Sequence, residues 1–309
     1  MANRATREAY GETLAELVGE GLDIVAVDAD LAGSTKTSDL GKAYPDRLVD
    51  VGIAEQDMIG VSAGLSLTGR IAFTASFAVF GTGRCYDQIR NTVCDSGLNV
   101  KVCPTHAGIT VGEDGATHQS LEDIGMMRML PTMRVLVPAD YRSAKAAIRI
   151  AATTTDGPFY VRMGRHPVPE VYGAGETFGL GRANVLRKGS DVTIAACGVE
   201  VAQALAAAGL LAAKGVDAEV IDVFSVKPLD ADAILASASK TGHVVTCEEH
   251  MVAGGMGSAV AELLAERCPT PMRFVGMRSF GTSAPGDVLL RHFGLDAAGI
   301  ARQVEAFLA

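Results

Sequence analysis

The segment His106–His118, HAGITVGEDGATH, combines residues that bind polar ligands with a backbone that can approach them closely. Between its two histidines, Glu113 and Asp114 lie between two glycines. A neutral histidine can exchange protons near pH 7, and glycine adopts backbone conformations closed to other residues. A solvent-exposed turn without a role is the alternative interpretation. Because functional residues gather on loops held by a rigid scaffold, the segment is interpreted as a ligand-binding loop.

The residues after this loop predict where the next helix begins. Ser120 and Asp123 form an S-x-x-D pattern, which is typical of a helix N-terminus, so we expect a helix to start near Leu121. This start would place Asp114 and His118 on a loop at the helix entrance. Cys103, His106 and His118 could also be zinc ligands, but no fourth ligand has a suitable spacing. A metal site in this chain is therefore not favoured.

A second candidate, Glu55, stands in VGIAEQD, directly after an expected strand and at the start of a helical pattern. The helix dipole favours a carboxylate at such a position, which would be a purely structural role. A buried carboxylate that hydrogen-bonds a ligand nitrogen is the functional alternative. The local sequence does not separate the two.

Phe77 and Phe80 stand three positions apart in ASFAVFGTGR. Residues at this spacing share one face of a helix, and ordinary core packing is the default interpretation. Only 5% of the chain is aromatic, so two rings beside a glycine-rich turn also suggest a stacking surface.

Arg7 and Arg165 lie near the ends of expected elements, and arginine suits bidentate phosphate binding, although each alone could be a solvated charge. The GGMGS segment (254–258) resembles a phosphate cradle but lacks the Lys-Ser/Thr of a nucleotide-binding loop. We interpret it as tight backbone packing.

The elements that must position these residues follow an α/β pattern. Short β-branched runs alternate with helical stretches, which predicts a mostly parallel sheet covered by helices on both faces. The expected strands are 24–28, 47–51, 71–76, 100–105, 134–138 and 159–163, and helical patterns cover 57–67, 83–95 and 141–152. Ligands of open α/β sheets bind beyond the carboxyl ends of the strands, where the loop after 100–105 would lie.

The 309 residues are enough for two domains. Proline and glycine interrupt the α/β rhythm near 167–181, so we predict a first domain over 1–168, a linker over 169–181 and a second α/β domain over 182–309. The second domain is expected to fold as its own layered structure.

Composition excludes several classes of partner. A net charge of −9 disfavours a nucleic-acid partner. No apolar run approaches the length of a membrane span, and the charged start MANRATREAYGE is unlike a signal peptide. Six cysteines without a C-x-x-C pair indicate reduced thiols, so a cytoplasmic protein is expected.

Taken together, these motifs resemble the transketolase family of thiamine-diphosphate enzymes. GEDGATHQ is the most specific motif, and IAEQ and SFAVF add to it. The resemblance covers nearly the whole chain but only the C-terminal half of a full-length transketolase. It implies the pyrimidine-binding fold followed by the small C-terminal domain.

The resemblance implies a role for each cofactor-side residue. Glu55 matches the glutamate that hydrogen-bonds N1′ of the aminopyrimidine and promotes the imino tautomer that deprotonates C2 of the thiazolium. Phe77 and Phe80 match the aromatic residues that pack against the pyrimidine ring. Asp30, in DADLAGS, matches an aspartate near the thiazolium.

On the substrate side, His118 matches the histidine near the C1 hydroxyl and the carbonyl oxygen of the donor ketose. Asp114 matches the residue that contacts the C2 hydroxyl of the acceptor. The positions that match the substrate-phosphate group are Arg7, Ser34, His106 and Arg165.

Three departures from the family pattern matter. Ala107-Gly108 stand where two-domain transketolases usually carry Asp-Ser, and Gly83 stands where a third aromatic residue is common. Nothing resembles the GDG…N segment that binds Mg²⁺ and the cofactor's diphosphate. The resemblance therefore implies that the diphosphate and Mg²⁺ are held by a separate N-terminal subunit.

We interpret the chain as the C-terminal subunit of a split transketolase, a transferase of pentose phosphate metabolism that moves a two-carbon ketol unit from a ketose phosphate to an aldose phosphate. The expected assembly is an α2β2 heterotetramer, or at least a self-dimer, inactive without the partner. Alternatives are a ketol transferase for an unusual sugar phosphate and a subunit like deoxyxylulose-phosphate synthase or the 2-oxo acid dehydrogenase beta chain. A non-catalytic assembly or regulatory subunit is the non-enzyme alternative.

Overall fold

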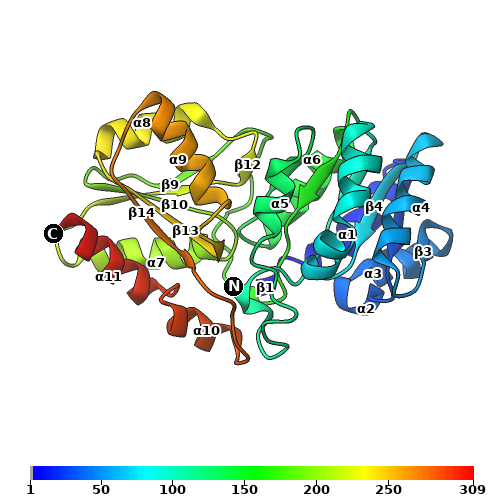
Figure 1. Cartoon of the computed structure of the whole chain (residues 1–309), viewed down its shortest axis with the longest axis horizontal. Coiled ribbons are helices and arrows are strands. Elements are labelled where there is room, and N and C mark those ends of the chain that lie inside the picture. The colour runs from blue at the N-terminus through cyan, green and yellow to red at the C-terminus, as the bar shows by residue number, and fades with distance from the viewer. Residues whose placement is uncertain (1–2) are drawn as a thin grey trace.

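The run Ile24–Asp28 (β2) is buried along its whole length, which is typical of a central parallel strand covered on both faces. A computed structural model describes residues 3–309 and places β2 in a seven-stranded sheet of order β12-β6-β7-β5-β4-β2-β3 (Figure 1). All strands except β12 run parallel. The other strands of this sheet are β3 (Leu48–Asp50), β4 (Ile71–Ala75), β5 (Val100–Val102), β6 (Arg134–Leu136), β7 (Phe159–Val161) and β12 (Ser225–Lys227).

The alternation of side chains along β2 builds a separate core on each face of the sheet. Ile24 and Ala26 pack with α1 (Glu8–Gly19), α3 (Thr37–Ala43) and α6 (Tyr141–Thr153). Val25 and Val27 pack on the other face with α4 (Glu55–Leu67) and α5 (Asp123–Met129). Short segments complete this part of the fold: α2 (Ala32–Thr35), η1 (Pro45–Arg47) and η4 (Ile109–Val111). The six predicted strands and the helices predicted over 57–67 and 141–152 are therefore confirmed.

The helix predicted over 83–95 takes a different form. The chain is π-helical over Val79–Arg84 (η2) and again over Gln88–Asp95 (η3). π-Helical turns are rare and occur often at functional sites. The first of these segments begins two residues after Phe77.

The second sheet has the order β14-β13-β10-β11-β9, parallel except for β9. Its strands are β9 (Asn184–Arg187), β10 (Val192–Ala196), β11 (Ala218–Asp222), β13 (Val244–Met251) and β14 (Met272–Met277). The helices of this half are α7 (Glu200–Ala212), α8 (Ala231–Thr241), α9 (Met256–Arg267), α10 (Gly286–Phe293) and α11 (Ala297–Leu308). The expected α/β architecture is confirmed in both halves.

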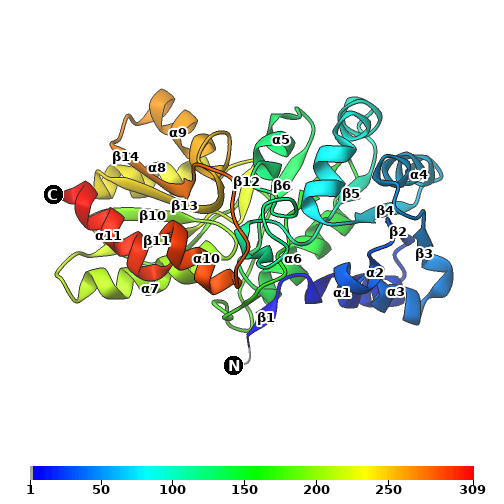
Figure 2. The ribbon, with the colours of Figure 1, turned by 60° about the horizontal axis from the view of Figure 1, so that its bottom comes forward.

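The two halves are joined more closely than two independent domains. Strand β12 leaves the second half and pairs antiparallel with β6 at the edge of the first sheet, and Figure 2 shows it between the halves. One hydrophobic core contains Val135 of β6 together with Ile221 and Val226 from the second half. A two-stranded sheet of β1 (Arg4–Ala5) and β8 (Pro167–Val168) lies near the junction. The second half therefore has its own sheet but shares a core and a strand with the first.

The segment predicted as a linker is packed against both halves. The Tyr172 side chain is buried, its hydroxyl donates to Asp222 Oδ2 at 2.5 Å, and its ring meets that of Phe178 edge to face. The backbone amides of Val171 and Tyr172 donate to Asp140 Oδ2 at 3.0 and 3.1 Å. The segment thus fixes one half to the other.

All six cysteines are free, and five of them are buried. Within residues 3–309, the helices are too short or too polar to cross a membrane.

We expect Tyr172→Phe to lower the free energy of unfolding by about 1–3 kcal/mol, because the buried Asp222 carboxyl loses a hydrogen-bond donor. Urea unfolding of the purified chain measures the change. Tyr44→Phe is the control, since the Tyr44 hydroxyl makes no hydrogen bond within the described residues. Equal losses in the two variants would contradict a specific role for the Tyr172 contact.

Candidate functional site

Glu55 is the first residue of α4, and it is only 5% exposed. Its Oε1 accepts from Arg84 Nη1 at 3.2 Å. An open cavity of about 470 Å³ lies against this pair and is lined by Ile53, Ala54, Glu55, Gln56, Asp57 and Arg84. No hydrogen bond to Glu55 Oε2 is present among the described residues. A buried carboxylate with one oxygen still available beside an open cavity can accept a hydrogen bond from a ligand.

The Phe77 and Phe80 rings stack with centroids 6.1 Å apart, at an interplanar angle of 18°. Both side chains are half-buried, and neither belongs to a buried core cluster. The Arg84 guanidinium lies 4.0 Å from the Phe80 centroid, so the rings are continuous with the Glu55 pair. The pair therefore forms a stacking surface rather than core packing.

His106 and His118 meet this aromatic surface from the loop predicted to bind a ligand. The His106 ring stacks on Phe77 with centroids 3.7 Å apart, and the His118 ring lies edge-on to Phe80 at 5.3 Å. The two histidines and Glu55 thus border one aromatic surface.

Hydrogen bonds fix the tautomer of His106. Its Nε2 lies 3.2 Å from Arg7 Nη1, and arginine can only donate, so Nε2 accepts. The remaining proton sits on Nδ1, 2.7 Å from Thr105 Oγ1. Burial lowers the pKa of His106 to about 3, and the nearby charges of Arg7 and Arg165 act in the same direction. His106 is therefore neutral at physiological pH.

The remaining substrate-side residues lie around His106. Arg7 Nη1 donates to the Ser34 carbonyl at 2.9 Å. Arg165 Nη1 donates to the Val111 carbonyl at 2.8 Å and to Asp114 Oδ2 at 3.3 Å. The structure brings together the positions predicted to form an anion site, with Asp114 ion-paired to one of its arginines.

Asp30 is the predicted residue that stands apart. It follows β2 in a left-handed conformation (φ 61°), is exposed, and its backbone amide donates to Asp50 Oδ1 at 3.1 Å. Within residues 3–309, its side chain makes no hydrogen bond or ion pair with the other predicted site residues.

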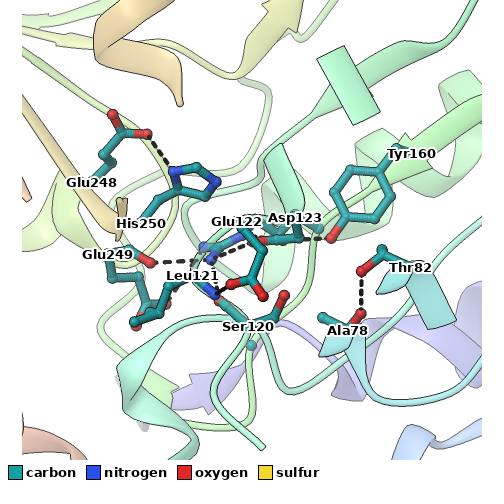
Figure 3. A network of polar contacts seen from close by, with 12 residues as sticks. Ala78, Thr82, Ser120, Leu121, Glu122, Asp123, Tyr160, Glu248, Glu249 and His250 are labelled. Carbon is teal, nitrogen blue, oxygen red and sulfur yellow. Dashed lines mark hydrogen bonds and ion pairs between the residues drawn. The ribbon is translucent and has the colours of Figure 1, made fainter. Parts of the chain in front are cut away.

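A helix follows the loop as predicted and begins two residues after Leu121, but the capping pattern predicted from Ser120 and Asp123 does not form. Helix α5 begins at Asp123, and Glu122 precedes it without a side-chain capping bond. Asp123 is buried and accepts from Arg162 Nε at 2.7 Å and from the Tyr160 hydroxyl at 2.5 Å (Figure 3). A buried arginine requires a paired carboxylate, so Asp123 is used in this ion pair rather than in a capping box.

The GGMGS segment is tight packing, as predicted. The amides of Met256 and Gly257 donate to the Glu248 carboxylate at 2.7 and 2.8 Å. A Cβ at position 255 would lie 2.3 Å from that carboxylate. The N-terminus of α9 therefore binds an internal anion.

Arg84, Thr105, Arg162 and Glu249 are site-forming residues that no sequence motif identified. Arg84 lies in the same ASFAVFGTGR segment as the two rings, and that proximity was an available signal. Arg162 and Glu249 carry no local motif. Among the described residues, no group of three or more His, Cys, Asp or Glu side chains could hold a metal ion.

Comparisons with known proteins agree on one family. Residues 2–170 match the domain family "Transketolase, pyrimidine binding domain", and residues 181–300 match the domain family "Transketolase, C-terminal domain". A 6-deoxy-6-sulfo-D-fructose transketolase subunit from Clostridium sp. is 46% identical, over 96% of this chain and 92% of the relative. One of the subunits of an apulose-4-phosphate transketolase, from Phocaeicola vulgatus, is 38% identical, over 100% of this chain and 99% of the relative.

Among solved structures, the chain is similar to one described as a split gene transketolase, inactive beta4 tetramer. The two superpose with a TM-score of 0.91 at 48% identity, over 99% of this chain and 98% of the other.

We expect His106 to make the folded chain sensitive to acid. Its folded pKa of about 3 lies below the ordinary value of 6.5, so below about pH 6.5 the unfolded chain takes up a proton that the folded chain does not. Stability is lost as the pH falls. Between about pH 7 and 5.5, the free energy of unfolding of the native chain should fall by about 1 kcal/mol more than that of His106→Asn.

Urea unfolding at several pH values measures this difference. His292→Asn, which removes an exposed imidazole, is the control and should follow the native chain. Parallel curves for the native chain and His106→Asn would contradict the assignment.

Proposed function

The chain belongs to the transketolase family, in which it corresponds to the C-terminal subunit of a split transketolase, and we propose that it supplies the pyrimidine-binding and sugar-binding half of a shared active site. The reaction would move a two-carbon ketol unit from a ketose phosphate to an aldose phosphate. The observation that carries the proposal is that Arg84 connects Glu55, which lines an open cavity, to the Phe77–Phe80 pair. The His118 ring lies edge-on to the same pair.

The residues fit the aminopyrimidine half of thiamine diphosphate. A ring between the stacking surface and the cavity would meet aromatic faces, and the available Glu55 oxygen would share a proton with a ring nitrogen, accepting a hydrogen bond from it when that nitrogen is protonated. When bound, the thiazolium of the cofactor would supply the stabilised carbanion that ketol transfer requires.

Glu55 would hold or accept a proton at that ring nitrogen, and Arg84 orients its carboxylate through Oε1. The aromatic pair would keep water from the ring. His118 lies beside Phe80 and can hold or move a proton at a sugar oxygen.

The sugar's phosphate would be bound by Arg7 and Arg165, which carry the positive charge of the cluster. His106 is neutral and accepts from Arg7, so its part is to hold that guanidinium in place. The Ser34 carbonyl accepts from the same guanidinium. Asp114, paired with Arg165, is positioned for a sugar hydroxyl. The role given to Asp30 beside the thiazolium stays a prediction.

We place the Mg²⁺ and diphosphate ligands on an N-terminal partner subunit, in an α2β2 assembly. The similar solved structure is of a split gene transketolase as an inactive beta4 tetramer, which supports the idea that this type of chain needs a partner for activity. A cytoplasmic location and a place in pentose phosphate metabolism are parts of the same proposal, and six cysteines that form no disulfide with one another fit that location.

A specialised sugar substrate is the second candidate. The relatives are named as transketolases of 6-deoxy-6-sulfo-D-fructose and apulose-4-phosphate. Sulfonate and phosphate are both tetrahedral anions that two arginines can bind. Ala107-Gly108 replaces the usual Asp-Ser beside this cluster, which supports a different sugar preference.

The experiment that tests the proposal is a tagged pull-down from native lysate, followed by reconstitution with the co-purifying protein. We expect a stoichiometric partner that carries the diphosphate-binding segment, and ketol transfer with a panel of aldose phosphates and sulfonated sugars. Consumption of pyruvate with release of CO2 instead would overturn the ketol-transfer assignment.

We expect Glu55→Ala to lower the activity of the reconstituted complex by about 100-fold or more, because proton handling at the ring nitrogen is lost. Gel filtration should show the complex still assembled. Asp232→Ala, which removes an exposed carboxylate from the first turn of α8, is the control and should keep full activity. Unchanged activity in Glu55→Ala would support a non-catalytic assembly role for the chain.

A further inference from the structure

A carboxylate from the second half of the chain lies directly on the loop that carries Asp114 and His118. Glu249, on β13, is buried, and its Oε2 accepts from the Thr110 amide at 3.1 Å and from the Thr110 hydroxyl at 2.8 Å. A Cβ at position 108 would lie 2.1–2.4 Å from the same carboxylate, and Gly108 has φ +83°. The carboxylate therefore occupies the space that a side chain at position 108 would need.

Glu249 is itself held by Arg162, which also binds Ser120, just after the C-terminal end of the loop. Arg162 Nη1 lies 3.7 Å from Glu249 Oε1, and Nη2 donates to the Glu249 carbonyl at 3.1 Å. Arg162 Nη2 also lies 3.4 Å from the Ser120 carbonyl, which accepts from it. Figure 3 shows Glu249, Ser120 and Asp123 gathered in this network. The loop is thus attached near both of its ends to one buried ion-pair network.

A second segment of the same half, Thr282 and Ser283, contacts the loop at two places, Glu113 and Gln119. Gln119 Nε2 donates to the Thr282 carbonyl at 2.9 Å, and the Ser283 hydroxyl donates to the Glu113 carbonyl at 2.6 Å. Asp114 and His118 lie between these attachments. Their placement therefore depends on contacts that the second half supplies.

We propose that Glu249 is a positioning residue for sugar binding, which sets the conformation of the 108–119 loop through Thr110 and requires glycine at position 108. The inference rests on the proposed function, because it assigns Asp114 and His118 of that loop to the sugar. It also gives a physical reason for the Ala107-Gly108 departure. With Glu249 in place, the serine that the usual Asp-Ser pattern would put at position 108 does not fit.

The test compares Glu249→Gln and Thr110→Val in the reconstituted complex with Glu248→Gln as the matched control. Glu248 is the neighbouring buried carboxylate, which accepts two hydrogen bonds, both from backbone amides of α9, and none from the loop. We expect kcat/KM for the sugar phosphate to fall by about fivefold or more in both loop variants, with a higher KM from Asp114 and a lower kcat from His118, while half-saturation by thiamine diphosphate changes by less than about twofold. Thr110→Ser, which keeps the hydroxyl, should have the same KM as the native chain. Glu248→Gln should leave KM unchanged.

A half-saturation by thiamine diphosphate that rises as much as the KM for the sugar would indicate a merely structural role and would overturn the proposal. Hydrogen exchange on the chain alone supplies a readout that does not need activity: amides of residues 108–119 should exchange faster in Glu249→Gln than in the native chain and in Glu248→Gln. Equal exchange would overturn the positioning role even in an active complex. Faster exchange in the isolated Glu249→Gln chain, together with a reconstituted native complex that transfers no ketol unit, would support the role of Glu249 in setting the loop and refute the proposed function instead.

Discussion

The buried guanidinium of Arg162 is the constraint on which the candidate site depends. Its side chain is 4% exposed, and it meets Asp123 at 0% and Glu249 at 4% exposure. A charge removed from water in this way requires compensating charge and hydrogen bonds, and loss of one partner leaves the other unpaired. Burial opposes ionisation of Asp123, but the Arg162 charge and the Tyr160 hydroxyl outweigh it, so the pKa of Asp123 lies below its usual value. Glu249 differs: burial raises its pKa to about 6 despite Arg162 and the Thr110 bonds.

This network connects three parts of the molecule that are far apart in the chain. Arg162 follows β7 of the first sheet, Asp123 begins α5, and Glu249 lies on β13 of the second sheet. Together with strand β12 and the core shared through Val226, it joins the two halves. The loop predicted to bind a ligand is hydrogen-bonded to this junction near both of its ends.

The site itself separates two electrostatic environments. Around Glu55, an exposed arginine and an open cavity keep a buried carboxylate accessible. Around His106, burial and two arginines keep the imidazole neutral, so the positive charge of this cluster belongs to the arginines alone. The aromatic surface lies between them, with Phe77 stacked on His106 and Phe80 in contact with the Arg84 guanidinium.

The strands could be predicted from sequence because burial on both faces produces short apolar runs, as in Ile24–Asp28, and such a pattern is local. The clustered polar loop and its family resemblance likewise lie within a short stretch of chain.

Pairings between distant residues could not be predicted in this way. Glu55 meets Arg84 across 29 positions and Thr110 meets Glu249 across 139, and neither pair has a periodic signal. The capping role predicted from the S-x-x-D pattern is wrong for the same reason. A capping preference worth about 1 kcal/mol is outweighed by the need to neutralise the buried Arg162, which the sheet brings next to Asp123. Local sequence determined the elements and the chemistry available at the site, whereas the order of strands in the sheets decided which charges meet.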